Sequence, residues 1–174
     1  MKPKAIFLDR DGVINKEKNY LYKKEDFEFI EGVFDACRYF QSIGYQLIVV
    51  TNQSGIARGY YLEEDFHKLT KWMLKKFKEK NIKILDLFFC PHGPKSTCNC
   101  RKPKPGMLLK AKEKYNVDME NSWMIGDKEA DVGAANAAGI ENTILVKTGH
   151  EIDEANSNAK FILKSMWNTI EIIK

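Results

Sequence analysis

Two aspartates stand two positions apart in the segment DRDG, residues 9–12, directly after a short apolar run. Carboxylates this close cannot both ionise freely, so Asp9 and Asp11 indicate a bound cation or a shared proton. An Asp-x-Asp-Gly string alone is also common in solvated turns. Its meaning depends on the rest of the chain, where polar segments follow apolar runs in the same way at residues 51–55 and 127–131.

The segments TNQSG (51–55) and DKEAD (127–131) add a hydroxyl, a glycine-bearing loop and further acids. Ligands of open parallel sheets bind beyond the carboxyl ends of the strands, so we expect the three segments at one edge of a sheet. Hard oxygen ligands beside a phosphate favour Mg²⁺, which we expect Asp9 and Asp127 to hold. Taken together, the three segments favour a catalytic site over a solvated turn.

The chemistry that these residue types support is phosphoryl transfer. A carboxylate such as Asp9 can attack phosphorus and form an acyl phosphate, which splits hydrolysis into two displacements. Asp11 could protonate the leaving alcohol and later accept a proton from water. Charge on the phosphoryl oxygens needs fixed donors, which the Thr51 hydroxyl, the backbone amides after it and a lysine could supply. Spacing alone does not choose between Lys102 and Lys104.

Three of the four cysteines and one of the three histidines gather in CPHGPKSTCNCRKPKPG, residues 90–106. Four soft or borderline ligands close a tetrahedral zinc site and leave no position for water, which predicts a structural zinc. The ligands of this zinc-binding loop would be Cys90, His92, Cys98 and Cys100. Their spacing strains a disulfide between Cys98 and Cys100, and a free-thiol loop is the remaining alternative. The zinc would fix Arg101 and Lys102, and structural zinc can contribute on the order of 10 kcal/mol to folding.

Alternating strands and helices must position these residues. Short apolar runs, rich in β-branched and aromatic residues, predict buried strands at 5–8, 47–50, 85–89, 123–125 and 143–146. Apolar spacing of three and four residues, with glycine or proline at the ends, predicts helices at 32–43, 63–80, 105–115 and 129–138. After a polar loop at 150–158, the tail predicts a short strand and a terminal helix. The fold class is therefore α/β, with a Rossmann-like parallel sheet covered by helices on both faces.

Composition limits the classes of protein that fit. A chain of 174 residues, 44% of them apolar, suits one domain, 1–174, with a sizeable core. The net charge of +4 is spread along the chain, which fits an anionic ligand better than a nucleic-acid partner. Without an export signal or a membrane-spanning run, we expect a cytoplasmic protein with no membrane partner. We expect no catalytic part for His67, on a helix, or His150, in a polar loop, and we expect Cys37 in the core.

The motifs DRDGVIN, TNQSG and GDKEAD, with a lysine between the last two, resemble those of the haloacid dehalogenase superfamily of Mg²⁺-requiring phosphatases. The resemblance implies that Asp9 is the nucleophile and Asp11 the general acid and base. It implies that Thr51 and Lys102 stabilise the transferring phosphoryl group. The Mg²⁺ ligands it implies are Asp9, the backbone carbonyl of Asp11, and Asp127.

A narrower resemblance runs from about residue 4 to 147 and adds the zinc-binding loop and the strings TNQSGIARGYY and CRKPKPGM. It is to the branch that removes the 7-phosphate of D-glycero-D-manno-heptose 1,7-bisphosphate, on the route to nucleotide-activated heptose for lipopolysaccharide or surface-layer glycans. This branch implies a phosphorylated sugar as partner, a monomer, no large cap domain, and an Asp131 that orients the lysine or a metal-bound water. The substrate contacts it implies are Glu17, Lys18, Asn19, Tyr20, Asn52, Gln53, Ser54, Arg101 and Lys128.

Three other functions stay open at this level. Histidinol-phosphate phosphatases share the motifs and the zinc loop, but their substrate carries one phosphate and a cationic amine. The cations Arg101, Lys102 and Lys128 suit a second phosphate better. A polynucleotide 3′-phosphatase would need a basic, aromatic-lined groove. A zinc-stapled binding module without turnover would not need the full catalytic set.

Overall fold

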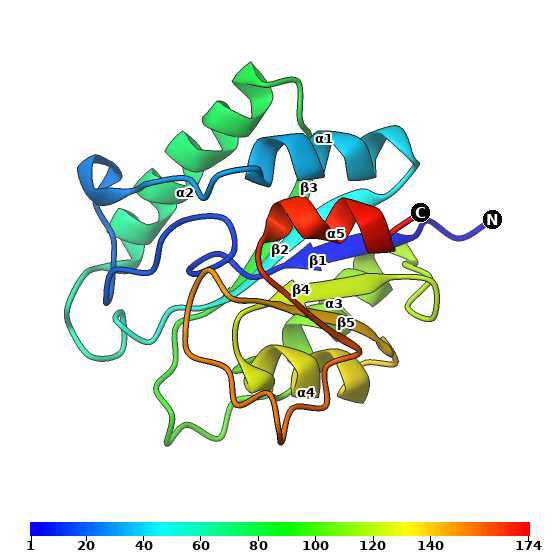
Figure 1. Ribbon diagram of the computed structural model, residues 1–174. Coiled ribbons are helices and arrows are strands. Elements are labelled where there is room, and N and C mark those ends of the chain that lie inside the picture. The colour runs from blue at the N-terminus through cyan, green and yellow to red at the C-terminus, as the bar shows by residue number, and fades with distance from the viewer.

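The computed structural model describes residues 1–174 and contains one six-stranded parallel sheet with strand order β3-β2-β1-β4-β5-β6 (Figure 1). The strands are β1 (Ala5–Leu8), β2 (Gln46–Asn52), β3 (Ile84–Cys90), β4 (Trp123–Gly126), β5 (Asn142–Val146) and β6 (Phe161–Leu163). The strands expected from the apolar runs are confirmed, and so is the short strand of the tail. Their ends differ by at most two residues from those expected.

Five helices cover the sheet on both sides. They are α1 (Val33–Ser42), α2 (Glu63–Glu79), α3 (Gly106–Tyr115), α4 (Glu129–Ala137) and α5 (Met166–Ile172). In Figure 1, α1, α2 and α5 lie on one face of the sheet, and α3 and α4 lie on the other. The predicted α/β fold class and the predicted helices are confirmed.

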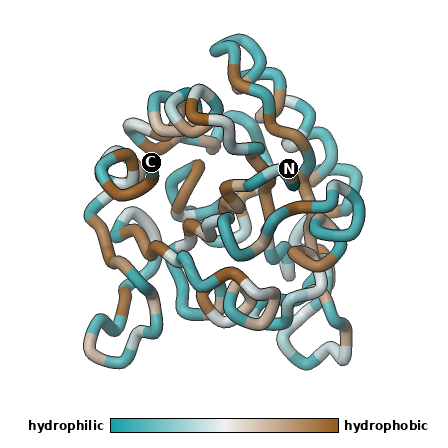
Figure 2. Tube along the Cα trace, turned by 90° about the vertical axis from the view of Figure 1, so that its right-hand side faces the viewer, coloured by the Kyte–Doolittle hydropathy of each residue, from teal (hydrophilic) through white to brown (hydrophobic).

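Two apolar clusters pack against the two faces of the sheet. Successive side chains of a strand point to opposite faces, so Ile6 and Leu8 belong to the cluster under α1, α2 and α5. Ala5 and Phe7 belong to the cluster over α3 and α4. This two-sided burial explains why β1 is a continuous apolar run. The trace in Figure 2 shows hydrophilic residues in most of the outer loops and apolar residues along the segments that cross the interior.

The sheet edge beyond the strand ends is not covered by a large cap domain. Between β1 and α1 the chain forms only the short 3-10 helix η1 (Lys24–Asp26) and two isolated bridges. Between β2 and α2 it forms a run of turns. Because β1 lies between β2 and β4, the residues that follow these three strands meet at the middle of this edge.

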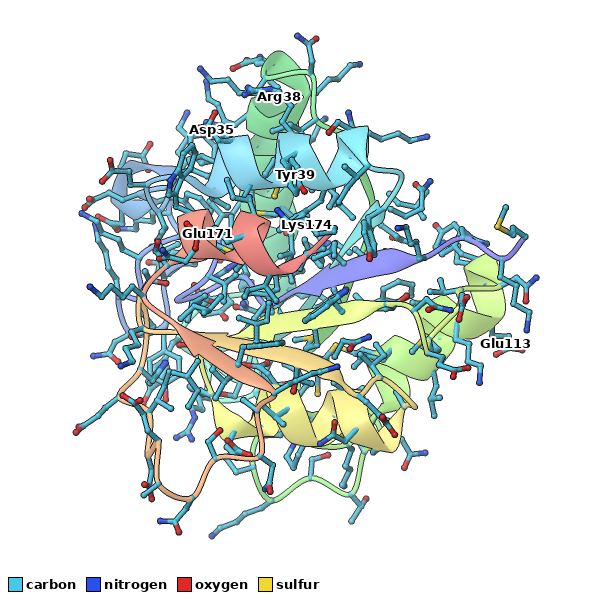
Figure 3. All side chains as sticks on the ribbon, turned by 45° about the vertical axis from the view of Figure 1, so that its right-hand side comes forward. Asp35, Arg38, Tyr39, Glu113, Glu171 and Lys174 are labelled. Carbon is cyan, nitrogen blue, oxygen red and sulfur yellow. The ribbon has the colours of Figure 1, made fainter.

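Polar and charged side chains project from the helices seen in Figure 3. On α1, Arg38 pairs with Asp35 at 3.0 Å in solvent. Tyr39, on the same helix, donates a hydrogen bond of 3.1 Å to the carbonyl of Ile173 and so fastens the C-terminal segment. None of the helices combines the length and the apolar character needed to cross a bilayer.

Candidate active site

Asp9 and Lys102 form a buried ion pair at the middle of the sheet edge. Asp9 directly follows β1, and its Oδ1 lies 3.0 Å from Lys102 Nζ. The same oxygen accepts a hydrogen bond of 2.8 Å from the backbone N–H of Arg10. Burial raises the pKa of Asp9 well above its ordinary value, Lys102 opposes the shift, and the carboxylates of Asp131 and Asp127 add to it. Further positive charge is therefore needed to keep Asp9 ionised.

The ammonium group of Lys102 has three partners, one for each of its hydrogens. It donates to Asp9 Oδ1, to Asp131 Oδ1 at 2.7 Å and to the carbonyl of Val50 at 2.9 Å. Burial would lower the pKa of Lys102, but the two carboxylates outweigh burial and raise this pKa above its ordinary value. Lys104, by contrast, is exposed and donates to the carbonyl of Cys98. Lys102 is thus the lysine that the fold brings to the aspartates.

Asp131 joins Lys102 to the first turn of α4. Its Oδ2 accepts the backbone N–H groups of Asp127 and Lys128, both at 3.1 Å, which caps the start of the helix. Its Oδ1 accepts from the lysine. Both carboxylate oxygens are therefore occupied, and Asp131 holds Lys102 in place.

Asp127 is fully buried in a tight cradle after β4. A side chain at Gly12 or at Gly149 would clash with the Asp127 carboxylate, so only glycine fits at these two positions. Asp127 Oδ2 accepts the backbone N–H of His150 at 2.9 Å and lies 2.6 Å from His150 Nδ1. Its Oδ1 is buried without a hydrogen-bond partner, which is costly unless a cation binds it. With two other carboxylates close enough to share an ion, the donor set fits a hard cation.

Asp11 is held by donors on several sides. Its Oδ1 accepts from Arg10 at 2.9 Å and from Asn15 at 3.0 Å, and its Oδ2 accepts from Gln53 at 3.1 Å. Burial acts to raise the pKa of Asp11, but the guanidinium of Arg10 and these hydrogen bonds outweigh it, so the pKa lies below its ordinary value. Asp11 is therefore ionised in this state.

A short chain of hydrogen bonds orients the amide of Gln53. Tyr61 donates its hydroxyl hydrogen to Gln53 Oε1, and Gln53 Nε2 donates to Asp11 and, at 2.9 Å, to Thr51 Oγ1. Burial raises the pKa of Tyr61 to about 12, so its hydroxyl stays a donor. Because Thr51 Oγ1 accepts from Gln53, the hydrogen of Thr51 has only a distant acceptor, the carbonyl of Asn52 at 3.5 Å.

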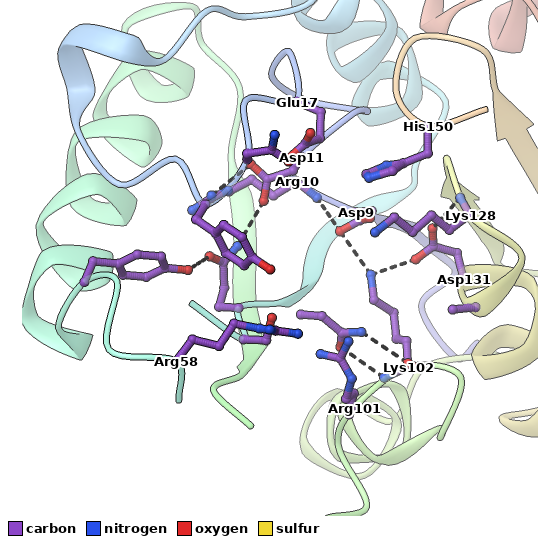
Figure 4. Close-up of a pocket in the computed structure, with 17 residues that line it drawn as sticks. Asp9, Arg10, Asp11, Glu17, Arg58, Arg101, Lys102, Lys128, Asp131 and His150 are labelled. Atoms are coloured by element: carbon purple, nitrogen blue, oxygen red, sulfur yellow. Dashed lines mark hydrogen bonds and ion pairs between the residues drawn. The ribbon is translucent and has the colours of Figure 1, made fainter. Parts of the chain in front are cut away.

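A pocket of about 220 Å³ opens above these groups (Figure 4). Within it, Arg10 and Lys102 form ion pairs with aspartates, and His150 contacts the carboxylate of Asp127. Three further cations, Arg58, Arg101 and Lys128, point toward the middle of the pocket from different loops and form no ion pair. This uncompensated positive charge suits a ligand with more than one anionic group.

The zinc-binding loop brings its four candidate ligands to one point. Cys90 is the last residue of β3, and its Sγ lies 3.8 Å from Cys98 Sγ. His92 Nδ1 lies 3.4 Å from Cys90 Sγ and 3.3 Å from Cys100 Sγ. Zinc bonds of about 2.3 Å to sulfur and 2.1 Å to nitrogen separate tetrahedral ligand atoms by about 3.6–3.8 Å. The cluster therefore fits a tetrahedral metal ion, and none of the cysteines forms a disulfide.

Comparison with known proteins places the chain in a family. A family model described as HAD-hydrolase-like matches residues 99–168. A D-glycero-alpha-D-manno-heptose-1,7-bisphosphate 7-phosphatase of Campylobacter jejuni is 57% identical over 84% of this chain and 84% of its own length. The chain belongs to the heptose bisphosphate phosphatase family.

Other members of the heptose bisphosphate phosphatase family match over most of their length. A D-glycero-beta-D-manno-heptose-1,7-bisphosphate 7-phosphatase of Vibrio cholerae is 50% identical over 88% of this chain and 87% of its own. The crystal structure of a D,D-heptose 1,7-bisphosphate phosphatase from B. bronchiseptica, complexed with magnesium and phosphate, superposes with a TM-score of 0.84. It is 29% identical, and the alignment covers 97% of each chain. The chain is thus a phosphatase of the HAD type.

The fold brings most of the expected site residues together. Of the expected substrate contacts, those that line the pocket are Glu17, Asn19, Tyr20, Asn52, Gln53, Ser54, Arg101 and Lys128. Lys18 does not line it, because its ammonium pairs with Glu28 at 2.6 Å in solvent. Thr51 and Asp127 lie buried beneath the lining residues.

Four polar residues that line this pocket were not expected from the sequence: Arg10, Arg58, Tyr61 and His150. His150 lies in the loop predicted at 150–158, but we expected no part for it, and it contacts Asp127. A signal was present, because His150 follows β5, which ends at the same sheet edge as β1 and β4. Arg58 and Tyr61 lie well beyond the end of β2, where sequence does not give the path of the chain.

Proposed function

We propose that this protein is a Mg²⁺-dependent phosphatase that removes the 7-phosphate of D-glycero-D-manno-heptose 1,7-bisphosphate through an aspartyl-phosphate intermediate. The observation that carries the proposal is the Lys102 ammonium between Asp9 and Asp131, beside the unpartnered Oδ1 of Asp127. Membership of the heptose bisphosphate phosphatase family supports the substrate.

The metal site of the proposal consists of Asp9, Asp127 and the backbone carbonyl of Asp11. The orphaned buried oxygen of Asp127 supports a cation there. When bound, Mg²⁺ would offset the negative charge of the carboxylates and of the phosphoryl oxygens.

The first displacement uses Asp9 as nucleophile. Asp9 Oδ1 already accepts from Lys102 and from the N–H of Arg10, so Oδ2 is the oxygen free to attack phosphorus. The Oδ2–P bond forms as the bond between phosphorus and the sugar oxygen breaks, and Asp11 donates a proton to that oxygen. Lys102 and the hydrogen of Thr51 stabilise the charge on the phosphoryl oxygens.

The second displacement releases inorganic phosphate. Water attacks phosphorus, Asp11 accepts a proton from that water, and the bond to Asp9 Oδ2 breaks, which restores the carboxylate. Asp11 is ionised in the free site, as this step requires. The acid step requires its protonated form, which the negative charge of a bound phosphate ester favours by repulsion.

The uncompensated cations of the pocket support a bisphosphate over histidinol phosphate. Arg58, Arg101 and Lys128 provide three positive charges for anionic oxygens of the substrate. Apart from Asp9, Asp11 and Asp131, the only acidic residue that lines the pocket is Glu17. A substrate with a cationic amine would meet repulsion from these three side chains.

The proposal also covers the zinc site, the oligomeric state and the cellular location of the enzyme. We infer a structural zinc at Cys90, His92, Cys98 and Cys100, because the ligand spacing suits it. We infer a single-domain monomer, and a cytoplasmic location, where reduced thiols persist. The product would enter the synthesis of nucleotide-activated heptose for lipopolysaccharide or surface-layer glycans.

A comparison of kcat/KM tests the proposal. Both anomers of the heptose bisphosphate are measured beside histidinol phosphate, with Mg²⁺ and in Mg²⁺-free buffer. We expect at least one anomer to exceed histidinol phosphate by about tenfold or more, and turnover to depend on Mg²⁺. Equal or better turnover of histidinol phosphate would contradict the substrate, and full activity in Mg²⁺-free buffer would contradict the metal.

A further inference from the structure

We propose that His150 is a positioning residue that restricts Asp127 to a single metal-facing oxygen, so that the metal site selects Mg²⁺ against Ca²⁺. The inference deepens the proposed function and rests on it, because it concerns the metal that the proposed reaction uses. His150 lies in the loop after β5 and lines the pocket (Figure 4). Its side chain is 40% exposed, yet it contacts the fully buried carboxylate of Asp127.

The Oδ2 atom of Asp127 has no acceptor capacity left. A carboxylate oxygen has two lone pairs, and this one accepts the backbone N–H of His150 at 2.9 Å and lies 2.6 Å from His150 Nδ1. Because an ionised carboxylate can only accept, Nδ1 carries the hydrogen of the second bond. The backbone at Gly12 and Gly149 also lies close against Oδ2. Among these neighbours, the imidazole is the one that a side-chain substitution can remove.

The other carboxylates of the cluster are occupied in the same way. Asp9 Oδ1 accepts from Lys102 Nζ at 3.0 Å and from the backbone N–H of Arg10 at 2.8 Å. Asp131 accepts two backbone N–H groups at Oδ2 and the ammonium of Lys102 at Oδ1. The oxygens without a donor are therefore Asp9 Oδ2 and Asp127 Oδ1, one from each of the two proposed carboxylate ligands.

Single carboxylate oxygens suit the smaller of the two ions. Mg²⁺ needs near-octahedral geometry at about 2.0–2.1 Å, which two such oxygens, a carbonyl, waters and a phosphate oxygen can supply. Ca²⁺ takes about six to eight oxygens at about 2.3–2.6 Å and often uses both oxygens of one carboxylate. The hydrogen bond from the His150 side chain withholds the second oxygen of Asp127. It therefore removes a ligand that Ca²⁺ would use and that Mg²⁺ does not need.

The loop that carries His150 is fastened separately at its far end. Glu129 Oε2 accepts from Ser157 Oγ, and Glu129 Oε1 accepts the backbone N–H of Asn158, both at 2.8 Å. Glu129 is exposed and does not line the pocket. Loss of this contact would loosen the same loop without removing a donor from Asp127. It therefore separates the effect of loop order from the effect of the His150 hydrogen bond.

The experiment measures metal binding without turnover. The purified protein, freed of Mg²⁺, is titrated with Mn²⁺ while free Mn²⁺ is followed by electron paramagnetic resonance, and Mg²⁺ or Ca²⁺ then displaces the bound Mn²⁺. The quantity compared is the dissociation constant of Ca²⁺ divided by that of Mg²⁺. The variants are His150→Ala, His150→Asn and Glu129→Ala. Asparagine places an N–H donor at the same number of bonds from the backbone as Nδ1 of histidine.

We expect His150→Ala to weaken Mg²⁺ binding, because Asp127 loses a partner that orients it, while Ca²⁺ compensates through the released Oδ2. The ratio should fall by about tenfold. His150→Asn and Glu129→Ala should keep it within about twofold of the wild type, because both retain a side-chain donor at Asp127.

The outcomes separate this inference from the proposed function. If His150→Ala keeps the ratio, even with both metals bound more weakly, the side chain only fastens the loop and the inference is wrong. It is also wrong if His150→Asn or Glu129→Ala lowers the ratio as far as His150→Ala does. In these cases the proposed function stands. If the wild type binds no divalent cation and is fully active in Mg²⁺-free buffer, the metal of the proposed function is wrong and the inference fails with it.

Discussion

Asn52 and Lys102, fifty positions apart in the chain, exchange two hydrogen bonds. The backbone N–H of Lys102 donates to Asn52 Oδ1 at 3.0 Å, and Asn52 Nδ2 donates to the carbonyl of Lys102 at 3.2 Å. Asn52 ends β2, and its partner in the next strand is Cys90, the first residue of the zinc-binding loop. The loop therefore leaves the sheet and returns to it at neighbouring positions, so order in the loop bears directly on Lys102.

Removing two ligands of the zinc-binding loop tests this connection. We expect the double variant Cys98→Ser, Cys100→Ser to lose bound zinc and to be cleaved faster by protease within 90–106. A loss of about 3 kcal/mol of stability would lower the midpoint of thermal unfolding by about 6–12 °C. Activity should also fall, because the loop that positions Lys102 becomes less ordered. Metal analysis, limited proteolysis and thermal unfolding provide the measurements.

The control for the loop is Thr97→Ala, which changes an exposed residue that is not a ligand. It should keep the metal content, the protease resistance and the melting point of the wild type. A wild-type protein that contains no zinc and is fully active would overturn the structural role of the metal.

Replacing Asp131 by asparagine tests how Lys102 is held. The amide still offers an oxygen to the N–H groups that start α4, but it removes one of the two charges around the buried ammonium. We expect kcat to fall by about 10- to 100-fold with a smaller change in KM, and stability to fall by about 1–3 kcal/mol. Steady-state kinetics and denaturant unfolding measure the two effects. An unchanged kcat would mean that Lys102 does not need Asp131.

The strands and the residues directly after them could be predicted from the sequence for one physical reason. A strand buried on both faces must be apolar throughout, so β1, β2 and β4 end visibly where the first polar residue appears. The parallel arrangement then brings Asp9, Asn52 and Asp127 to one edge without knowledge of any loop. The cysteine and histidine cluster could also be predicted from the sequence, because the types of its ligands and their close spacing are local properties of the chain.

Side chains on longer loops could not be placed in this way. Lys18 and Arg58 are both exposed cations near the pocket, but Lys18 pairs with Glu28 and Arg58 points inward. The difference arises from the left-handed turn at Asn19 and Tyr20 and from the compact turns after β2. Neither the backbone path nor the partner of a long flexible side chain follows from local spacing.

Replacing Asp9 by asparagine tests the nucleophile. The amide is nearly the same size, and it removes a charge whose burial, together with the repulsion from Asp131 and Asp127, raises the pKa of Asp9, so we expect a folded protein. We expect kcat to fall by about 10⁴-fold or more, because no other carboxylate can take the place of Asp9 at Lys102. The control Glu171→Gln removes an exposed, unpaired carboxylate and should not change the rate. A rate within about tenfold of the wild type would falsify the assignment.

Asp86, on β3 and away from the pocket, gives the fold an acid-sensitive contact. Its carboxylate accepts from Lys114 Nζ and from the hydroxyl of Tyr115, both at 2.7 Å, and so ties β3 to α3. Its partial burial would raise the pKa, but these donors outweigh burial and hold the pKa of Asp86 below its ordinary value of 3.8. Because the folded pKa is the lower one, the contribution to stability is complete above pH 3.8 and is lost as the pH falls through the folded pKa.

The variant Asp86→Asn should therefore lose about 1 kcal/mol of stability at neutral pH and almost none in strong acid. The free energy of unfolding of both proteins, measured by denaturant from pH 7 down to pH 2.5, should converge in the acid range. Glu113→Gln serves as the matched control, since Glu113 is an exposed carboxylate of α3 without an ion-pair partner (Figure 3). A difference between wild type and Asp86→Asn that stayed constant down to the lowest pH would show that the contact acts through packing and not through the charge of Asp86.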